Sequence, residues 1–206
     1  MVLSHPADLG ILGAACGAVR TMAIRDSITR ILEEMQRTLA QISPEGLERL
    51  AEDVLKADRI YVAGGGRSGV MARAFAMRLM HLGLATYVVG ETTTPAIQSG
   101  DLLLACSASG KTHVTVLVSK VAQEAGAHIF AMTATPDSPM ARLADETIVI
   151  PAPSKRSGKW ADQSVQYGGS LFEQALLVVL DAVSSEIGRR LGKTPQELDS
   201  RHANLE

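Results

Sequence analysis

The sequence predicts an α/β protein: a single doubly wound domain in which helices flank a five-stranded parallel sheet. The first observation is a series of short segments that are apolar throughout, as expected of strands buried on both faces. The second is the alternation of these segments with stretches of helical periodicity, which is typical of parallel strands joined by helices. The third is a length of 206 residues with 46% hydrophobic residues, which suits one domain with one core.

Two helices are predicted before the first strand. Apolar side chains recur at helical spacing over residues 24–41. Ser43 and Pro44 then have the residue types that begin a second helix, with proline at its first position. Residues 1–21 are weakly periodic, and we treat them as an extension of unclear role that precedes a domain at 22–190.

Five strands and three further helices follow. The strands are predicted at residues 59–63, 85–89, 101–106, 128–133 and 147–150. The helices are predicted at residues 70–82, at 113–125 and at 170–187. Residues 151–169 show no period and form a long loop, which in compact domains is often functional. Residues 191–206 form a polar C-terminal tail.

The composition argues against several classes of protein. A net charge of −2 and an aromatic content of 3% disfavour a nucleic-acid partner. No apolar run approaches the roughly 18 residues of a membrane span, so we expect no membrane partner. Cys16 and Cys106 lack the spacing of metal ligands, so we expect no metal site and a reducing, cytoplasmic location.

The first glycine-rich loop, residues 64–69 (GGGRSG), follows a strand and precedes a helix. It matches G-x-G-x-x-G, and Glu91 lies near the position of the acidic residue in a dinucleotide fingerprint. The match is weak, because glycines meet the need for a tight turn after the first strand of many α/β domains. Arg67 and Ser68 suit a phosphosugar as well as a dinucleotide, so a nicotinamide-dependent oxidoreductase remains an alternative.

The second loop, residues 107–112 (SASGKT), ends like a nucleotide-binding P-loop. The P-loop pattern requires a glycine where Ala105 stands, so a triphosphate cradle is incomplete. The hydroxyls of Ser107, Ser109 and Thr112 lie between a strand and the N-terminus of a helix, where the backbone N–H groups and the helix dipole favour an anion. A capping role would explain one hydroxyl more readily than three, so we predict a phosphate site.

Several segments together point to a family. The two loops, with residues 74–83 (AFAMRLMHLG), 88–97 (VVGETTTPAI) and 168–183 (GGSLFEQALLVVLDAV), resemble the SIS domain of phosphosugar isomerases and binding proteins. Within it they are similar to the 6-phospho-3-hexuloisomerases of the ribulose monophosphate pathway of formaldehyde assimilation. The resemblance covers about residues 24–190.

The resemblance implies a cofactor-free isomerase that interconverts 3-hexulose 6-phosphate and fructose 6-phosphate as a homotetramer. It implies Glu173 as the catalytic base and His81 as its catalytic partner, in its own subunit or across a subunit contact. The substrate-binding residues that we expect are those of the two loops: Arg67, Ser68, Ser107, Ala108, Ser109, Gly110, Lys111 and Thr112. Lys111 and Ala108 depart from the family pattern, in which Glu and Gly are common at those positions, and Tyr167-Gly168 stands where relatives often have Pro-Met.

Other interpretations of the same residues remain open. Glu173 lies near the start of a predicted helix, where a carboxylate can simply complement the helix dipole. His81 lies near a helix end, where a histidine can pack or cap carbonyl groups. A non-catalytic SIS module that binds a phosphosugar, or an isomerase of another phosphosugar, would fit most of the same sequence features.

Overall fold

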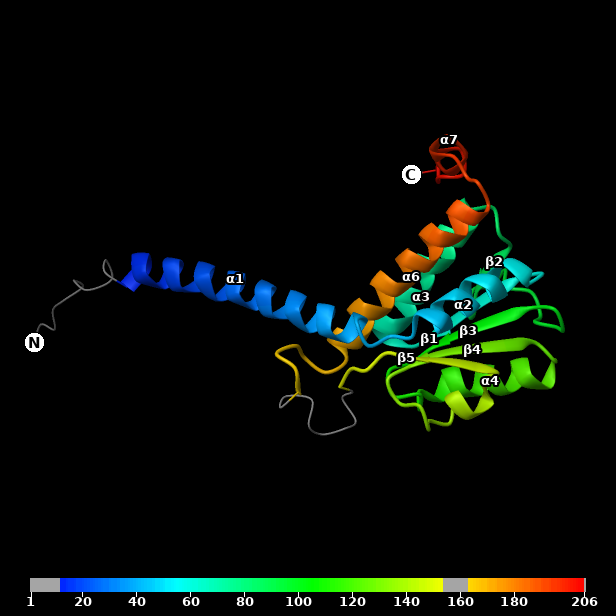
Figure 1. The fold of residues 1–206 in the computed structure, drawn as a ribbon, viewed down its shortest axis with the longest axis horizontal. Helices are drawn as coiled ribbons and strands as arrows, with labels where there is room; N and C mark the ends of the chain where they lie inside the picture. Colours follow the sequence, from blue (N-terminus) through cyan, green and yellow to red (C-terminus); the bar gives the residue numbers. More distant parts are fainter. Residues whose placement is uncertain (1–11, 154–162, 206) are drawn as a thin grey trace, which may run out of the picture.

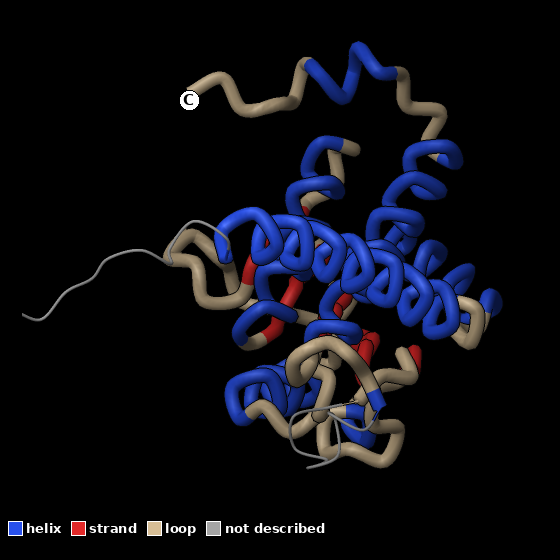
Figure 2. The backbone as a smooth tube through the Cα atoms, turned by 90° about the vertical axis from the view of Figure 1, so that its left-hand side faces the viewer, coloured by secondary structure: helices blue, strands red, loops and turns tan. Residues whose placement is uncertain are grey.

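The computed structural model describes residues 12–153 and 163–205, with side chains described from residue 23 onward, and forms a three-layer α/β domain (Figures 1 and 2). All five strands of its sheet are parallel, in the order β2-β1-β3-β4-β5. The strands are β1 (Ile60–Gly64), β2 (Thr86–Val88), β3 (Leu102–Cys106), β4 (His128–Thr133) and β5 (Glu146–Val149). The helices are α1 (Leu12–Leu39), α2 (Pro44–Lys56), α3 (Gly66–His81), α4 (His113–Glu124), the 3-10 turn η1 (Ala141–Leu143), α6 (Ser170–Arg190) and α7 (Pro195–Asp199).

The sheet is buried on both faces, which explains why its strands read as continuous apolar runs. Helices α2, α3 and α6 cover one face and α4 covers the other (Figure 1). Successive side chains of a strand point to opposite faces, so Leu102 and Leu104 of β3 enter the first core and Leu103 enters the second. The predicted doubly wound fold with five parallel strands is confirmed.

The order of the strands creates a switch point between β1 and β3. The chain moves outward from β1 to β2, returns to the other side of β1 to form β3, and then continues to β4 and β5. Gly64, the last residue of β1, is in register with Cys106, the last residue of β3. The two loops that the sequence singled out therefore leave the same edge of the sheet side by side, where ligands bind in open α/β sheets.

Several element boundaries differ from those that the sequence predicts. Helix α2 begins as expected, since the hydroxyl of Ser43 accepts the N–H of Gly46 (3.1 Å) and Pro44 occupies the first helical position. Helix α3 begins at Gly66 rather than at residue 70, so four of the six residues of the first glycine loop are helical. The polar tail contains the short helix α7, which a capping box between Thr194 and Glu197 begins.

Helix α1 is longer than its apolar periodicity predicts. It begins at Leu12, within the segment treated as an extension, and runs without a break to Leu39. Its C-terminal part lies against the domain beside α6, and the rest projects away from the domain (Figure 1). In the described part of the chain, no helix is both long enough and apolar enough to cross a membrane.

An ion pair joins the amino ends of β1 and β3, at the edge of the sheet opposite the two loops. Asp101, whose side chain is fully buried, precedes β3 and accepts two bonds from the guanidinium of Arg59, at 2.9 and 2.7 Å. The same carboxylate accepts the N–H of Gln98 (2.8 Å). Every bond that Asp101 accepts is therefore removed from water, which makes the pair costly to break.

We predict that Asp101→Ala lowers the free energy of unfolding by about 3 kcal/mol, because it leaves the Arg59 guanidinium without its buried partner. Urea denaturation measures the change. Glu52→Ala is the matched control, since Glu52 pairs with Lys56 on the surface (3.3 Å) and such pairs contribute at most about 1 kcal/mol. Equal losses in the two variants would contradict a structural role for the buried pair.

Candidate active site

A cavity of about 490 Å³ lies at the carboxyl ends of β1 and β3, and three segments of the chain line it. The β1–α3 loop contributes one wall, and the β3–α4 loop contributes the second. The start of α6 and the residues just before it form the third. The lining residues are Gly65, Gly66, Arg67, Ser68, Ser107, Ala108, Ser109, Thr112, Tyr167, Gly169, Ser170 and Glu173.

Close packing of glycines shapes the first wall. A Cβ on Gly69 would lie 2.4 Å from the carbonyl oxygen of Gly64, so no larger residue fits where α3 begins against the end of β1. This contact brings the first turn of α3 to the cavity, with Ser68 buried and Arg67 largely exposed. The glycine pattern therefore has a packing reason that does not depend on a dinucleotide.

Glu91, the acidic residue of the possible dinucleotide fingerprint, lies outside the cavity. Glu91 pairs with Arg73 at 3.1 Å through two exposed side chains, and it does not line the cavity. A dinucleotide fingerprint needs this carboxylate at the ribose, beside the glycine loop. The position of Glu91 thus disfavours the nicotinamide-dependent alternative.

The hydroxyls of the second wall face one another rather than capping the helix. Ser107, which is 3% exposed, and Thr112 are joined through their hydroxyl oxygens (2.9 Å). Thr112 occupies the N-cap position of α4 but makes no side-chain capping bond. Ser109 accepts the N–H of Lys111 (3.2 Å), which tightens the loop. The hydroxyl of Thr112 therefore does not bind the first N–H groups of α4. These N–H groups can bind an anion instead.

Three helices begin at this cavity. The N-cap residues of α3, α4 and α6 are Gly65, Thr112 and Gly169, and all three line the cavity. Gly65 and Gly169 have no side chain that could cap a helix, and Thr112 makes no capping hydrogen bond. The partial positive charges of the three helix termini therefore converge where a phosphate would bind.

Glu173 provides the cavity with a carboxylate that pairs with Arg67. It lies in the first turn of α6, is 16% exposed, and its Oε2 lies 3.0 Å from Nε of Arg67. The partner of Arg67 in the structure is therefore a carboxylate. This pair joins the first wall of the cavity to the third, so the carboxylate shares the cavity with the hydroxyls of the second wall.

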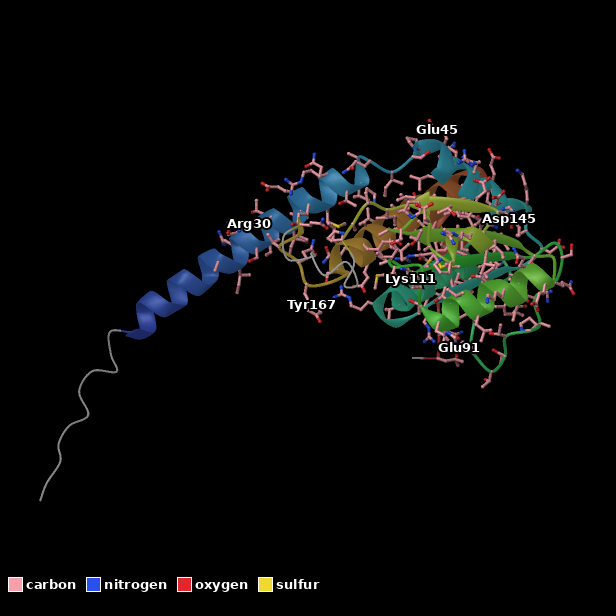
Figure 3. All side chains as sticks on the ribbon, turned by 90° about the horizontal axis from the view of Figure 1, so that it is seen from below. Arg30, Glu45, Glu91, Lys111, Asp145 and Tyr167 are labelled. Carbon is pink, nitrogen blue, oxygen red and sulfur yellow. The ribbon has the colours of Figure 1, made fainter. Side chains whose placement is uncertain are left out.

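Two of the expected binding residues do not line the cavity. Gly110 has φ of +56°, and a Cβ there would lie 1.9 Å from the hydroxyl oxygen of Ser138, so this glycine is required by packing behind the loop. Lys111 is exposed (Figure 3). Their assignment as substrate-binding residues therefore stays a prediction, while Arg67, Ser68, Ser107, Ala108, Ser109 and Thr112 all line the cavity.

His81 lies at the other end of α3. Thirteen residues separate it from Ser68, which at 1.5 Å per residue is about 20 Å along the helix. It lines a second cavity of about 440 Å³ with Arg78 and Lys193, and its ring stacks on His202 at 5.1 Å between centroids. Burial, His202 and Arg78 lower the pKa of His81. Within one chain the two expected catalytic residues are therefore apart.

Tyr167, Gly169 and Ser170 are lining residues that the sequence did not assign to the site. Tyr167-Gly168 was noted only as a departure from a family pattern. The long aperiodic loop before α6 was the available signal, although residues 154–162 of it lie outside the described residues.

Cys106 ends β3 near the cavity, but burial raises the pKa of its thiol to about 12, which makes it a poor nucleophile.

Comparison with known proteins identifies relatives of this chain. The SIS domain family matches residues 53–167. A protein of Mycobacterium gastri named 3-hexulose-6-phosphate isomerase is 45% identical, over 93% of this chain and 97% of its own length. A protein of the same name from Bacillus subtilis is 37% identical, over 90% of this chain and all of its own length.

A solved structure has the same fold. It is that of a hypothetical protein from Methanococcus jannaschii, for which a molecular function as 3-hexulose-6-phosphate isomerase was inferred. It is 33% identical to this chain with a TM-score of 0.76, and the match covers 88% of this chain and 99% of that protein.

We predict that combining Ser109→Ala with Thr112→Val raises the dissociation constant of a ketohexose phosphate at least about tenfold, because hydrogen bonds to charged groups contribute about 1.5–3 kcal/mol each. The measurement is the ligand-induced rise in melting temperature across a fructose 6-phosphate titration. Ser185→Ala, in the cavity beside His81, is the control and should bind normally. Weakened binding only in the Ser185 variant would move the phosphate site to that second cavity.

Proposed function

The chain belongs to the SIS domain family, and we propose that it is an isomerase that interconverts 3-hexulose 6-phosphate and fructose 6-phosphate. One observation carries the proposal: a hydroxyl-rich loop and three helix N-termini share a cavity with the paired carboxylate of Glu173. The hydroxyls and helix N-termini suit the binding of a phosphate monoester, and the carboxylate of Glu173 suits proton transfer. The cavity volume is also in the range of small-molecule sites.

The reaction moves a carbonyl from C3 to C2 of the sugar. A base removes the proton on C2 and an enediol forms, and the return of a proton to C3 leaves the carbonyl at C2. The substrate is neither oxidised nor reduced overall, so the chemistry requires no redox cofactor. It requires one base that reaches both carbons and a group that stabilises negative charge on oxygen.

We assign these roles to residues of the cavity. Ser107, Ser109 and Thr112 bind the phosphate, with the N–H groups at the start of α4. Glu173 is the base. Arg67, which lies beside the Glu173 carboxylate, is placed to turn toward the enediolate oxygen as its negative charge develops, because its side chain is 59% exposed.

We further propose that the protein acts as a homo-oligomer, a tetramer as in the family that the sequence resembles. Ile24, Ile28 and Leu32 form a stripe along the projecting part of α1, and each is more than half exposed. Their spacing places them on one face of the helix, as expected of a surface that packs against another subunit. His81, about 20 Å from Ser68 along its own α3, would then serve the cavity of a neighbouring subunit.

This role belongs to the ribulose monophosphate pathway, and we place the protein in the cytoplasm. A cytoplasmic location fits a sugar-phosphate substrate. It also fits the free, buried thiol of Cys106.

Glu173→Gln should lower kcat by about 10² to 10⁴-fold, the usual contribution of a general base, with little change in sugar-phosphate binding. The assay couples fructose 6-phosphate formation to a dehydrogenase, with 3-hexulose 6-phosphate made in place by a separate synthase. Glu124→Gln, the same change at the exposed end of α4 and outside both cavities, is the matched control. If Glu173→Gln retains wild-type kcat, Glu173 is not the base.

Mixed oligomers test where His81 acts. Glu173→Gln and His81→Asn subunits, each inactive alone, should regain part of the activity when they are co-expressed, because some cavities then combine an intact Glu173 with an intact His81 of the partner subunit. The measurement is kcat of the isolated hybrid, whose composition is checked by light scattering and mass spectrometry. A hybrid without activity, or a monomeric protein, would contradict action across subunits.

A further inference from the structure

A buried carboxylate on α1 holds the chain segment that leads into the active site. Glu34, 7% exposed, accepts three hydrogen bonds from three consecutive residues. Val165 N–H donates to Oε1 at 2.8 Å, while the Ser164 hydroxyl and the Gln166 amide donate to Oε2 at 2.7 and 3.2 Å. These bonds join positions 130 to 132 residues apart in the chain.

The cluster is largely buried, at the wall of a third cavity of about 480 Å³ that Glu34 helps to line. Ser164 and Gln166 are 8% and 6% exposed, and the Ser164 hydroxyl also accepts the N–H of Gln166 (3.0 Å). Burial by itself would raise the pKa of Glu34, but the donors of Val165, Ser164 and Gln166, with Arg37, lower it. The carboxylate therefore stays ionised, and as the shared acceptor it holds all three residues.

The segment continues directly into the third wall of the cavity. The carbonyl oxygen of Tyr167 accepts both the N–H (3.1 Å) and the hydroxyl (2.8 Å) of Ser170. The carbonyl oxygen of Gly169 accepts the N–H of Glu173 (3.0 Å). Figure 3 shows Tyr167 on the segment that runs beside the C-terminal half of α1. Short, ordered links thus run from Glu34 to the turn that carries Glu173.

We propose that Glu34 is a positioning residue of the active site: through residues 164–166 it holds Tyr167, Ser170 and the first turn of α6, so that Glu173 meets the substrate. The inference rests on the proposed function for its effect on turnover. The phosphate loop lies on another wall of the cavity, between β3 and α4, where the hydroxyls of Ser107 and Thr112 pair and Ser109 accepts the N–H of Lys111. Loss of Glu34 should therefore reduce turnover more than affinity.

The test is Glu34→Gln, which keeps the size of the side chain. The amide has a single acceptor oxygen, and its NH₂ group would face the donors of Val165, Ser164 or Gln166, so at least one bond is lost. Glu33→Gln is the matched control: it makes the same change on the same helix at an exposed side chain. We expect a fall in kcat of about 10- to 100-fold for Glu34→Gln with KM within about threefold, since small misplacements of reacting groups have effects of this size. The control should behave as wild type.

Hydrogen–deuterium exchange of the peptide that spans residues 163–170 gives a readout that does not depend on activity. Exchange should accelerate in Glu34→Gln and stay unchanged in Glu33→Gln, while peptides of β3 and β4 exchange as in wild type. If Glu34→Gln does not fold, Ser164→Ala replaces it, because it removes one donor of the same cluster and leaves α1 intact.

The outcomes separate this inference from the proposed function. Faster exchange at 163–170 with reduced kcat supports the positioning role. Unchanged exchange, or faster exchange with wild-type kcat, overturns it, as does a rise in KM that accounts for the whole effect. If the wild-type protein does not isomerise 3-hexulose 6-phosphate, the proposed function fails, and the exchange measurement alone then decides whether Glu34 holds the segment.

Discussion

The parallel pairing of β1 with β3 is the constraint on which the rest of this structure depends. Because Gly64 is in register with Cys106, the two loops that follow these strands leave the sheet together and enclose one cavity. At the other edge, the Arg59–Asp101 pair joins the amino ends of the same strands. A right-handed crossover on each side of this pair sends β2 and β4 in opposite directions, which leaves the crevice between the two loops open.

The cavity combines two electrostatic requirements that oppose each other. Three helix N-termini without a side-chain cap make it favourable for a phosphate dianion, whereas the proton abstraction that we propose needs a second negative group, the carboxylate of Glu173, in the same cavity. Arg67 reconciles them, because its guanidinium lies 3.0 Å from that carboxylate. The exposure of the Arg67 side chain leaves it free to move when a ligand enters. The same arrangement distinguishes this site from a dinucleotide site, in which an acidic residue must reach a ribose and Glu91 here pairs with Arg73 instead.

Helix α1 links an exposed surface of the domain to the segment that leads into the active site. Its projecting part exposes Ile24, Ile28 and Leu32, which suits contact with another subunit, while its C-terminal part carries Glu34 into the cluster with Ser164 and Gln166. A subunit that packs on α1 would therefore contact the same helix that binds residues 164–166, the segment that leads into α6. This gives a physical reason for an assembly to matter in an enzyme whose cavity is lined by residues of a single chain.

The sequence by itself determined the fold class, the five parallel strands and six of the lining residues: Arg67, Ser68, Ser107, Ala108, Ser109 and Thr112. The fold class and the two loops follow from local patterns, since apolar runs, glycine turns and hydroxyls at a strand end act within a few residues of one another. Glu173 was instead implied by the resemblance to the SIS family. Only the tertiary structure decided that Arg67 pairs with Glu173, that Gly110 is needed for packing against Ser138, that His81 lies at the far end of α3, and that Glu34 holds residues 164–166. Each of these depends on which side chains meet after the chain has folded, and Glu34 resembles any other polar residue of an amphipathic helix until its partners, some 130 positions away, are in place.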